Sequence, residues 1–195
     1  MNKKLETLIK VSVLAAIAAV VMLFEVSLVP LVPPFYKVDL SEVIVLLGGF
    51  ALGPGPAIMI EALKNFINFL LDGTTTMGIG EVANFLMGCA LVLPASYMYH
   101  KNKTKKQALL GMLVGIISLC VVSMILNYFV LLPAYAYFFK IPIEAFLSQA
   151  SIPVSSLFTF MLVAVLPFNL IKGTATCLVV FLVYKKVTPI LKGSK

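Results

Sequence analysis

The sequence predicts an all-α membrane protein with six transmembrane helices and with both termini in the cytoplasm. Three observations support this prediction: the overall hydropathy, the continuity of the apolar segments and the positions of the lysines. Hydrophobic residues make up 61% of the 195 residues, charged residues only 12%, and the mean hydropathy is +1.07. That charged share is about half the share in a soluble domain. Because the apolar runs are continuous rather than alternating, helices rather than a β-barrel are expected to satisfy the backbone in lipid.

Six apolar segments are expected to form the spans of one domain covering residues 1–195, at roughly 20 residues per span. Prolines end the first span after residue 29, and the segment GPGP at 53–56 separates the second from the third. Residues 154–187 are too long for one span, and Pro167 is expected to divide them. Residues 143–166 would then be a loop segment that folds back over the bundle. The expected spans are 7–29, 42–52, 57–71, 81–99, 107–132 and 167–187.

The lysines indicate the orientation of these spans. All 15 basic residues other than histidine are lysines, and eleven of them fall in the N-terminal segment, the turn at 100–106 and the C-terminal segment. With six spans these three regions share one side, which the positive-inside rule makes cytoplasmic. The net charge of +7 therefore reflects membrane orientation and does not indicate nucleic-acid binding.

Polar side chains inside the apolar segments gather toward the outer side of the membrane. Lys172 is the clearest case, since an ammonium in hydrocarbon costs several kcal/mol unless it is paired or hydrated. It shares a helix face with Asn169, three residues earlier. Glu81 and Asn84 repeat this spacing in the first turn of the fourth span, and Asn127 lies near the outer end of the fifth. Such convergence predicts a cavity filled by water or a ligand.

The third span carries a polar stripe that leads to the same side. Glu61, Lys64, Asn65 and Asn68 are spaced i, i+3, i+4 and i+7, and the threonine loop that includes Thr75 follows. Glu61 and Lys64 could alternatively be only an ion pair within the bundle, and Glu81 and Asn127 also have purely structural interpretations. Glu25 is an alternative partner for Lys172.

The expected site is rich in neutral hydrogen-bonding groups and has aromatic residues nearby. This mixture suits a polyhydroxylated or heteroaromatic small molecule better than a bare ion. No nucleotide-binding GxxxxGK[ST] motif, HExxH motif or GxSxG motif occurs, so neither an ATP site nor catalytic chemistry is indicated. The three cysteines are interpreted as small apolar residues rather than as a disulfide or metal site.

The first span contains a small-residue pattern toward its cytoplasmic half. Ser12, Ala15 and Ala19 lie at i, i+3 and i+7. This spacing lets another helix approach closely, either within the bundle or from a partner subunit.

Several segments together resemble the substrate-binding S components of energy-coupling-factor (ECF) vitamin transporters, most closely the riboflavin-specific type. They are FYKVDLSEV at 35–43, GGFALGP at 48–54, EALKNF at 61–66, GTTT at 73–76, GEVANF at 80–85 and FNLIKG at 168–173. The resemblance covers nearly the whole chain. It implies a six-helix S component of the bacterial plasma membrane that binds its vitamin near the outer face.

The resemblance also implies partners and site residues. Riboflavin, or its phosphorylated form, would be the transported ligand, with no further cofactor. A membrane coupling subunit (EcfT-like) would meet Ala15 and Ala19, and two cytoplasmic ATPases would drive transport. Asn127, Asn169 and Lys172 correspond to ligand-binding positions of the riboflavin type. The loop at 30–41, with Leu40 near its end, would cover the site.

Three other functions compete with this interpretation. The same fold could bind another vitamin, such as folate, thiamine or a biotin-like ligand. An ion-coupled secondary transporter could use the Glu61 and Lys64 stripe, although the inverted repeats typical of such proteins are not apparent. An intramembrane enzyme would need a nucleophile–base pair or a metal constellation, and the sequence offers neither.

Overall fold

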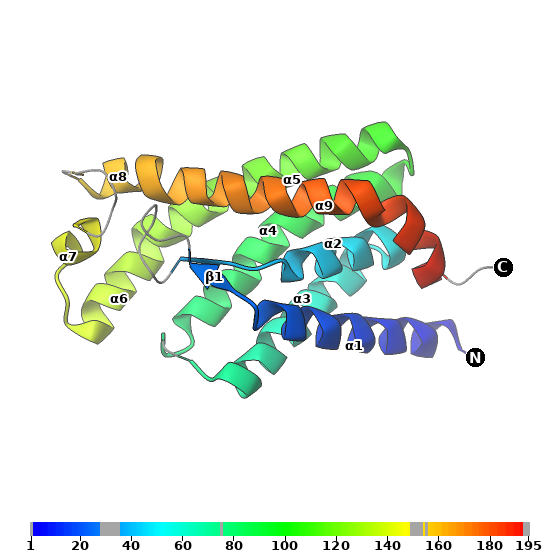
Figure 1. Cartoon of the computed structure of the whole chain (residues 1–195), viewed down its shortest axis with the longest axis horizontal. Helices are drawn as coiled ribbons and strands as arrows, with labels where there is room; N and C mark the ends of the chain where they lie inside the picture. The colour runs from blue at the N-terminus through cyan, green and yellow to red at the C-terminus, as the bar shows by residue number, and fades with distance from the viewer. Residues whose placement is uncertain (1, 28–35, 75, 149–153, 155, 193–195) are drawn as a thin grey trace.

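The computed structural model describes residues 2–27, 36–74, 76–148, 154 and 156–192, and these are almost entirely helical (Figure 1). The elements in chain order are α1 (Lys3–Met22), β1 (Val26–Ser27), β2 (Lys37–Val38), α2 (Ser41–Leu52), α3 (Pro54–Asp72), α4 (Ile79–Lys101), α5 (Lys105–Leu126), the π-helical turn η1 (Asn127–Leu131), α6 (Leu132–Phe139), α7 (Ile143–Leu147), α8 (Leu157–Phe160), the π-helical turn η2 (Met161–Val165) and α9 (Leu166–Lys192).

Six helical units form the membrane bundle. Within the described residues, four of them are long and apolar enough to cross a bilayer: α1, α4, the continuous run α5–η1–α6 and the continuous run α8–η2–α9. The other two are α2, which is short and apolar, and α3, which carries the polar stripe. The start of α1 and the end of α9 lie at the same end of the bundle (Figure 1), in agreement with the orientation deduced from the lysines.

Local sequence signals fix several helix ends. The side chain of Asn2 accepts a hydrogen bond from the Lys4 amide at the start of α1, and Thr104 accepts one from the Gln107 amide at the start of α5. Between α2 and α3, Gly53 has a φ of 112°, a conformation that residues with a Cβ rarely adopt. Pro54 follows at the first position of α3, where its missing N–H costs nothing.

The short helix α2 lies at the centre of the bundle. Ten of its twelve residues are buried, and it packs against α1, α3, α4 and α9. Around it the inner half of the bundle has an apolar core in which the rings of Phe50 and Tyr99 stack with centroids 4.5 Å apart. A second apolar cluster, which includes Tyr36, Phe160 and Phe168, lies where α4, α6 and α9 approach the outer end.

The structure corrects the predicted end of the first span. Helix α1 ends at Met22 rather than at residue 29, and Val26–Ser27 pairs with Lys37–Val38 as a short antiparallel ribbon. The prolines expected to end the first span lie at 30, 33 and 34, outside the described residues.

The prediction of a loop at 143–166 was wrong for its last part, because Leu157–Phe160 and Met161–Val165 run on into α9 as one helix. The fifth span likewise continues past residue 132 to Phe139. In both places the sequence suggested a break because of a proline. Pro133 and Pro167 are each the second residue after a π-helical turn. These wider turns change the register of the backbone hydrogen bonds just before the proline, so the helix continues.

Candidate ligand-binding site

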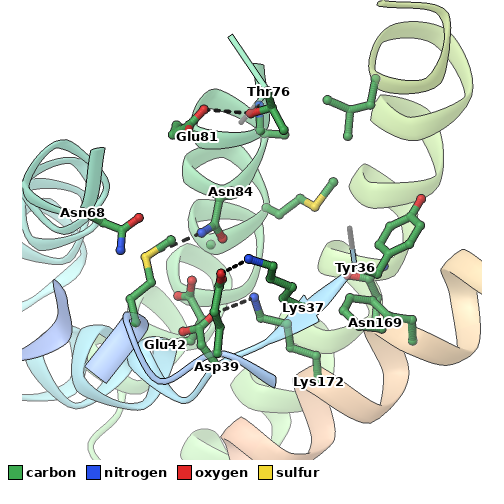
Figure 2. Close-up of a pocket in the computed structure, with 18 of the residues that line it drawn as sticks. Tyr36, Lys37, Asp39, Glu42, Asn68, Thr76, Glu81, Asn84, Asn169 and Lys172 are labelled. Carbon is green, nitrogen blue, oxygen red and sulfur yellow. Dashed lines mark hydrogen bonds and ion pairs between the residues drawn. The ribbon is translucent and has the colours of Figure 1, made fainter. Parts of the chain in front are cut away.

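A cavity of about 240 Å³ opens near the outer end of the bundle (Figure 2). One water molecule needs only about 10–15 Å³ on this measure, so the cavity can hold a small molecule. Its walls come from α1, α2, α3, α4, α5, η1, α6, α9, the segment that includes β2 and the loop between α3 and α4. The lining residues used below are Glu25, Tyr36, Lys37, Asp39, Glu42, Asn68, Asp72, Thr76, Glu81, Asn84, Gly88, Asn127, Phe168, Asn169 and Lys172.

The ion pair between Lys172 and Asp39 joins α9 to the start of α2. Lys172 Nζ lies 3.2 Å from Asp39 Oδ2, and both side chains are largely buried (Figure 2). Asp39 also accepts hydrogen bonds from the amide, at 2.8 Å, and from the hydroxyl of Ser41. Glu25, the partner suggested for Lys172 from the sequence, instead pairs with Lys37.

These contacts keep Asp39 ionised. Burial by itself disfavours the charged carboxyl, but the positive charges of Lys172 and Lys64 oppose that effect. Together with the hydrogen bonds from Ser41 they hold the pKa of Asp39 well below its ordinary value. The ammonium of Lys172 is therefore held at the cavity wall by a permanent negative charge.

Two asparagines of the cavity lie in or just after the π-helical turns. Asn127 begins η1 and donates to the Ser123 carbonyl at 2.8 Å, while Asn169 donates to the Val165 carbonyl, at the end of η2, at 2.8 Å. Because each amide nitrogen is used by the helix four residues back, each amide oxygen is directed elsewhere. π-helical turns occur frequently at functional sites. Here Asn127 at the start of η1 and Asn169 four residues after η2 place two buried carboxamides at one cavity.

Tyr36 connects the segment before α2 to this pair of helices. Its hydroxyl lies 2.6 Å from Asn127 Oδ1, and its ring lies against that of Phe168 with centroids 5.2 Å apart. Burial raises the pKa of the Tyr36 phenol, so it remains a neutral hydrogen-bond donor. The result is an aromatic wall beside the carboxamides.

Helices α3 and α4 form another wall of the cavity. Asn68 and Asn84 both line it, as predicted from their helix faces. Glu81 Oε2 accepts a hydrogen bond from the Thr76 hydroxyl at 3.1 Å, which ties the loop after α3 to the first turn of α4. Thr75, predicted to contact the ligand, lies outside the described residues.

Two other predicted ligand contacts lie elsewhere in the structure. Lys64 is fully buried and does not line the cavity; its Nζ lies 2.7 Å from Glu42 Oε1 and 2.8 Å from Glu61 Oε1. The interpretation of Glu61 and Lys64 as an ion pair in the bundle is thus the observed one, with Glu42 as a third member. Leu40 is 46% exposed and lines a separate shallow groove with Val21 and Phe24.

The comparisons with known proteins agree with this geometry. Residues 6–184 match the family model described as the ECF transporter, substrate-specific component. The chain belongs to this family. It is 32% identical, over 95% of its length and 94% of the relative's, to the riboflavin transporter FmnP of Bacillus subtilis. It is 34% identical, over 98% of its length and 93% of the relative's, to the riboflavin transporter RibU of Staphylococcus aureus.

A solved structure described as the S component of a bacterial ECF transporter has the same fold. It superposes with a TM-score of 0.77 at 30% identity, covering 98% of this chain and all of the other. This S component is therefore an integral membrane transport protein and not an enzyme. The described residues contain no group of three or more His, Cys, Asp or Glu side chains that could hold a metal ion.

The alanines expected to meet a coupling subunit are not accessible in this S component. Ala15 and Ala19 are 0% exposed and face the interior of the bundle, where α1 packs against α2 and α3. Ser12 lies on the exposed side of α1. In this conformation Ala15 and Ala19 serve packing within the chain, and docking of a coupling subunit on this face of α1 stays a prediction.

Sequence reasoning missed several cavity residues of this S component, among them Tyr36, Asp39 and Glu42. All three lie in the segment 36–42, which the apolar runs identify only as the end of a loop and the start of a short helix. The available signal was Asp39 two residues before Ser41, a spacing typical of a turn in which the carboxylate accepts backbone and hydroxyl hydrogen bonds.

Proposed function

We propose that this S component binds riboflavin in the outer cavity and takes part in its uptake. The observation that carries the proposal is the composition of the cavity wall, which combines the Tyr36 and Phe168 rings with the carboxamides of Asn127 and Asn169 and the ammonium of Lys172. A flavin has a flat heteroaromatic ring system and a polyhydroxylated chain, so it needs both kinds of surface. The names of the relatives support the same ligand.

The polar groups have free hydrogen-bonding capacity for such a ligand. Lys172 uses one N–H for Asp39 and, as an ammonium, has three. Asn169 donates to the backbone and still has a carboxamide oxygen to accept a bond. The ring system is expected to lie against Phe168 and Tyr36, and the hydroxyls against Asn127, Asn169 and Lys172.

The charges at the cavity favour the neutral vitamin over its phosphate ester. Two lysines line it, Lys37 and Lys172, and each is already paired with a carboxylate. Five carboxylates also line it: Glu25, Asp39, Glu42, Asp72 and Glu81. A phosphate dianion would meet this surplus of negative charge, so we expect riboflavin to bind more tightly than FMN.

Uptake then requires partners that hydrolyse ATP. The chain has no nucleotide-binding motif of its own. We propose a membrane coupling subunit and two cytoplasmic ATPases, consistent with membership of the ECF family. Reconstitution in liposomes tests this: riboflavin should accumulate only when these partners and ATP are present. Uptake by the chain alone, driven by a proton or sodium gradient, would instead indicate a secondary transporter.

Ligand binding is tested by purifying the protein in detergent from cells supplied with riboflavin. We expect a yellow protein that releases one flavin per chain on denaturation, and saturable quenching of riboflavin fluorescence by the ligand-free protein. A colourless protein that leaves riboflavin fluorescence unchanged would overturn the ligand assignment. The family membership would stand, and the other vitamins would be titrated next.

Lys172→Met is the most informative variant for the site. Loss of a hydrogen bond from a charged group costs about 1.5–3 kcal/mol, which lowers affinity roughly 10- to 100-fold. The change also leaves Asp39 unpaired, so the double variant Lys172→Met/Asp39→Asn is needed to separate a binding defect from a folding defect. Lys101→Met, at the exposed end of α4, is the matched control. Unchanged affinity in Lys172→Met would remove this lysine from the site.

A further inference from the structure

A buried polar cluster lies between the ligand cavity and the apolar core. It consists of Glu42 from α2 and of Glu61, Lys64 and Asn65 from α3, and each of these side chains is at least nine-tenths buried. Glu42 also lines the cavity, and Gly88 of α4 lies against the cluster. The cluster is therefore placed where a change in its charge would act on the ligand site.

The charges in the cluster do not balance if both carboxyls are ionised. The Lys64 ammonium contacts both carboxylates, Glu42 and Glu61, and its single positive charge leaves one negative charge in excess. The nearest other charges already balance each other, because Asp39 is paired with Lys172. An uncompensated charge inside a membrane protein is costly.

In the part of the chain that the structure describes, the remaining elements around the cluster do not supply a positive charge. From α4 the titratable group that faces the two carboxyls is the thiol of Cys89, and Glu81 is at the outer end of that helix, bonded to Thr76. On α1 the charged residues lie in its first two turns, at positions 3, 4, 6 and 10, and Glu25 beyond its end is paired with Lys37.

Three buried oxygens of the cluster have no hydrogen-bond donor: Glu42 Oε2, Glu61 Oε2 and Asn65 Oδ1. The orientation of Asn65 is not interchangeable, because its nitrogen donates to the Glu61 carbonyl at 2.9 Å and to Glu61 Oε1 at 2.8 Å. Its oxygen is thus a genuine acceptor. Buried acceptors without donors are rare in folded proteins and indicate a missing donor.

A donor that also carries a positive charge would both satisfy an acceptor and balance the excess negative charge. The space around the cluster limits which group this donor can be. A bound metal cation would sit between the carboxylates, but the Lys64 ammonium already occupies that position. The backbone of α4 closes another side, since a Cβ on Gly88 would lie 2.9 Å from Glu42 Oε1 and closer still to Glu61. A proton bound to one of the carboxyls would neutralise the excess negative charge and create an O–H donor, and it would need no additional space.

We propose that the cluster binds one proton, shared between the carboxyls of Glu42 and Glu61, directly beneath the ligand cavity. The proton brings the net charge of the cluster to zero and provides a hydroxyl donor for one of the three orphaned oxygens. It belongs to the pair rather than to one residue, as in other coupled carboxyls. The inference stands on the cluster alone and does not depend on which ligand fills the cavity.

Infrared spectroscopy of the wild-type protein tests the proposal directly. At neutral pH we expect a carbonyl band of a protonated carboxylic acid that shifts in heavy water and disappears when the sample is made alkaline. The variant Glu61→Gln, which carries a neutral amide in place of the shared proton, is expected to lack the band. Glu144→Gln, an exposed carboxyl of α7, is the matched control and should retain it.

Thermal stability gives a second readout that does not depend on the infrared signal. A folded state that holds a proton on a carboxyl loses stability as the pH rises through the titration of the cluster. The melting temperature of the wild type should therefore fall toward alkaline pH, and this slope should be reduced in Glu61→Gln but kept in Glu144→Gln. A wild-type spectrum without a protonated carboxyl band overturns the proposal, as expected if a buried water alone satisfied the acceptors.

Discussion

Replacement of Lys64 by methionine is expected to be the most destabilising single change in the bundle. Methionine preserves most of the side-chain volume but removes the ammonium that holds Glu42 and Glu61. Removal of one partner from a buried ion pair costs about 3–5 kcal/mol, because the other charge stays buried without compensation. For a chain of 150–250 residues, 1 kcal/mol corresponds to roughly 2–4 °C, so the melting temperature should fall by roughly 6–20 °C.

The assay can use the protein's own cysteines. The chain has no tryptophan, but Cys120 and Cys177 are free and buried in α5 and α9. A fluorogenic thiol-reactive dye therefore reports unfolding in detergent. Lys101→Met is again the control for the loss of a lysine at an exposed position. Riboflavin should raise the melting temperature of both proteins, since a ligand that binds only the folded state stabilises it.

A double-mutant cycle sharpens this prediction. If Lys64 acts by compensating carboxylates, Lys64→Met combined with Glu61→Gln should be less destabilised than the sum of the single variants, by about 0.5–3 kcal/mol. The reasoning would be refuted by a Lys64→Met protein that melts within about 2 °C of the wild type, or by effects of the two changes that simply add.

Three further predictions follow from the site. Tyr36→Phe removes the donor to the Asn127 oxygen and should weaken riboflavin binding about five-fold, equivalent to about 1 kcal/mol in a fluorescence titration; equal affinity would show that this bond is not used. Gly88→Ala should lower the melting temperature because its Cβ meets the buried carboxyls, whereas Gly55→Ala, with open space around it, should be neutral. Because the pKa of Asp39 is lowered in the folded state, its ionised carboxylate stabilises the fold at pH values above its ordinary pKa of 3.8. This stabilisation is lost as the pH falls through the lower pKa of the folded state. The melting temperature of Asp39→Asn should therefore depend less steeply on pH in acid than that of the wild type.

The sequence was most informative about the bundle as a whole. Continuous apolar runs reflect the thickness of the bilayer, and the lysine bias reflects which loops face the cytoplasm, so both can be read without knowing how the helices pack. They correctly placed both termini at one end, and polar residues of α3, α4, η1 and α9 line one cavity, as their positions predicted. Asn68, Asn84, Asn127, Asn169 and Lys172 all line it.

The failures came from features that depend on tertiary context. Proline usually ends or kinks a helix because it lacks an N–H and its ring crowds the preceding turn, but π-helical turns lie just before Pro133 and Pro167, and both helices continue. The helical spacing could place Lys64 on the polar face of α3, but it could not show that Lys64 forms an ion pair with Glu42, 22 residues earlier in the chain. Partners such as Asp39 for Lys172 are separated by too many residues for any periodic pattern to show.

The polar stripe of α3 has a consequence for the way the protein is made. Glu61 and Lys64 each add roughly 2.5–3.5 kcal/mol to the cost of transferring this helix into the bilayer on its own, which is why α3 does not qualify as an apolar span. The carboxylate of Glu42 lies on the preceding helix, and only Gly53 separates the two helices. We therefore expect α2 and α3 to leave the insertion machinery as a hairpin with their ion pairs already formed, before α9 is synthesised and closes the bundle around α2.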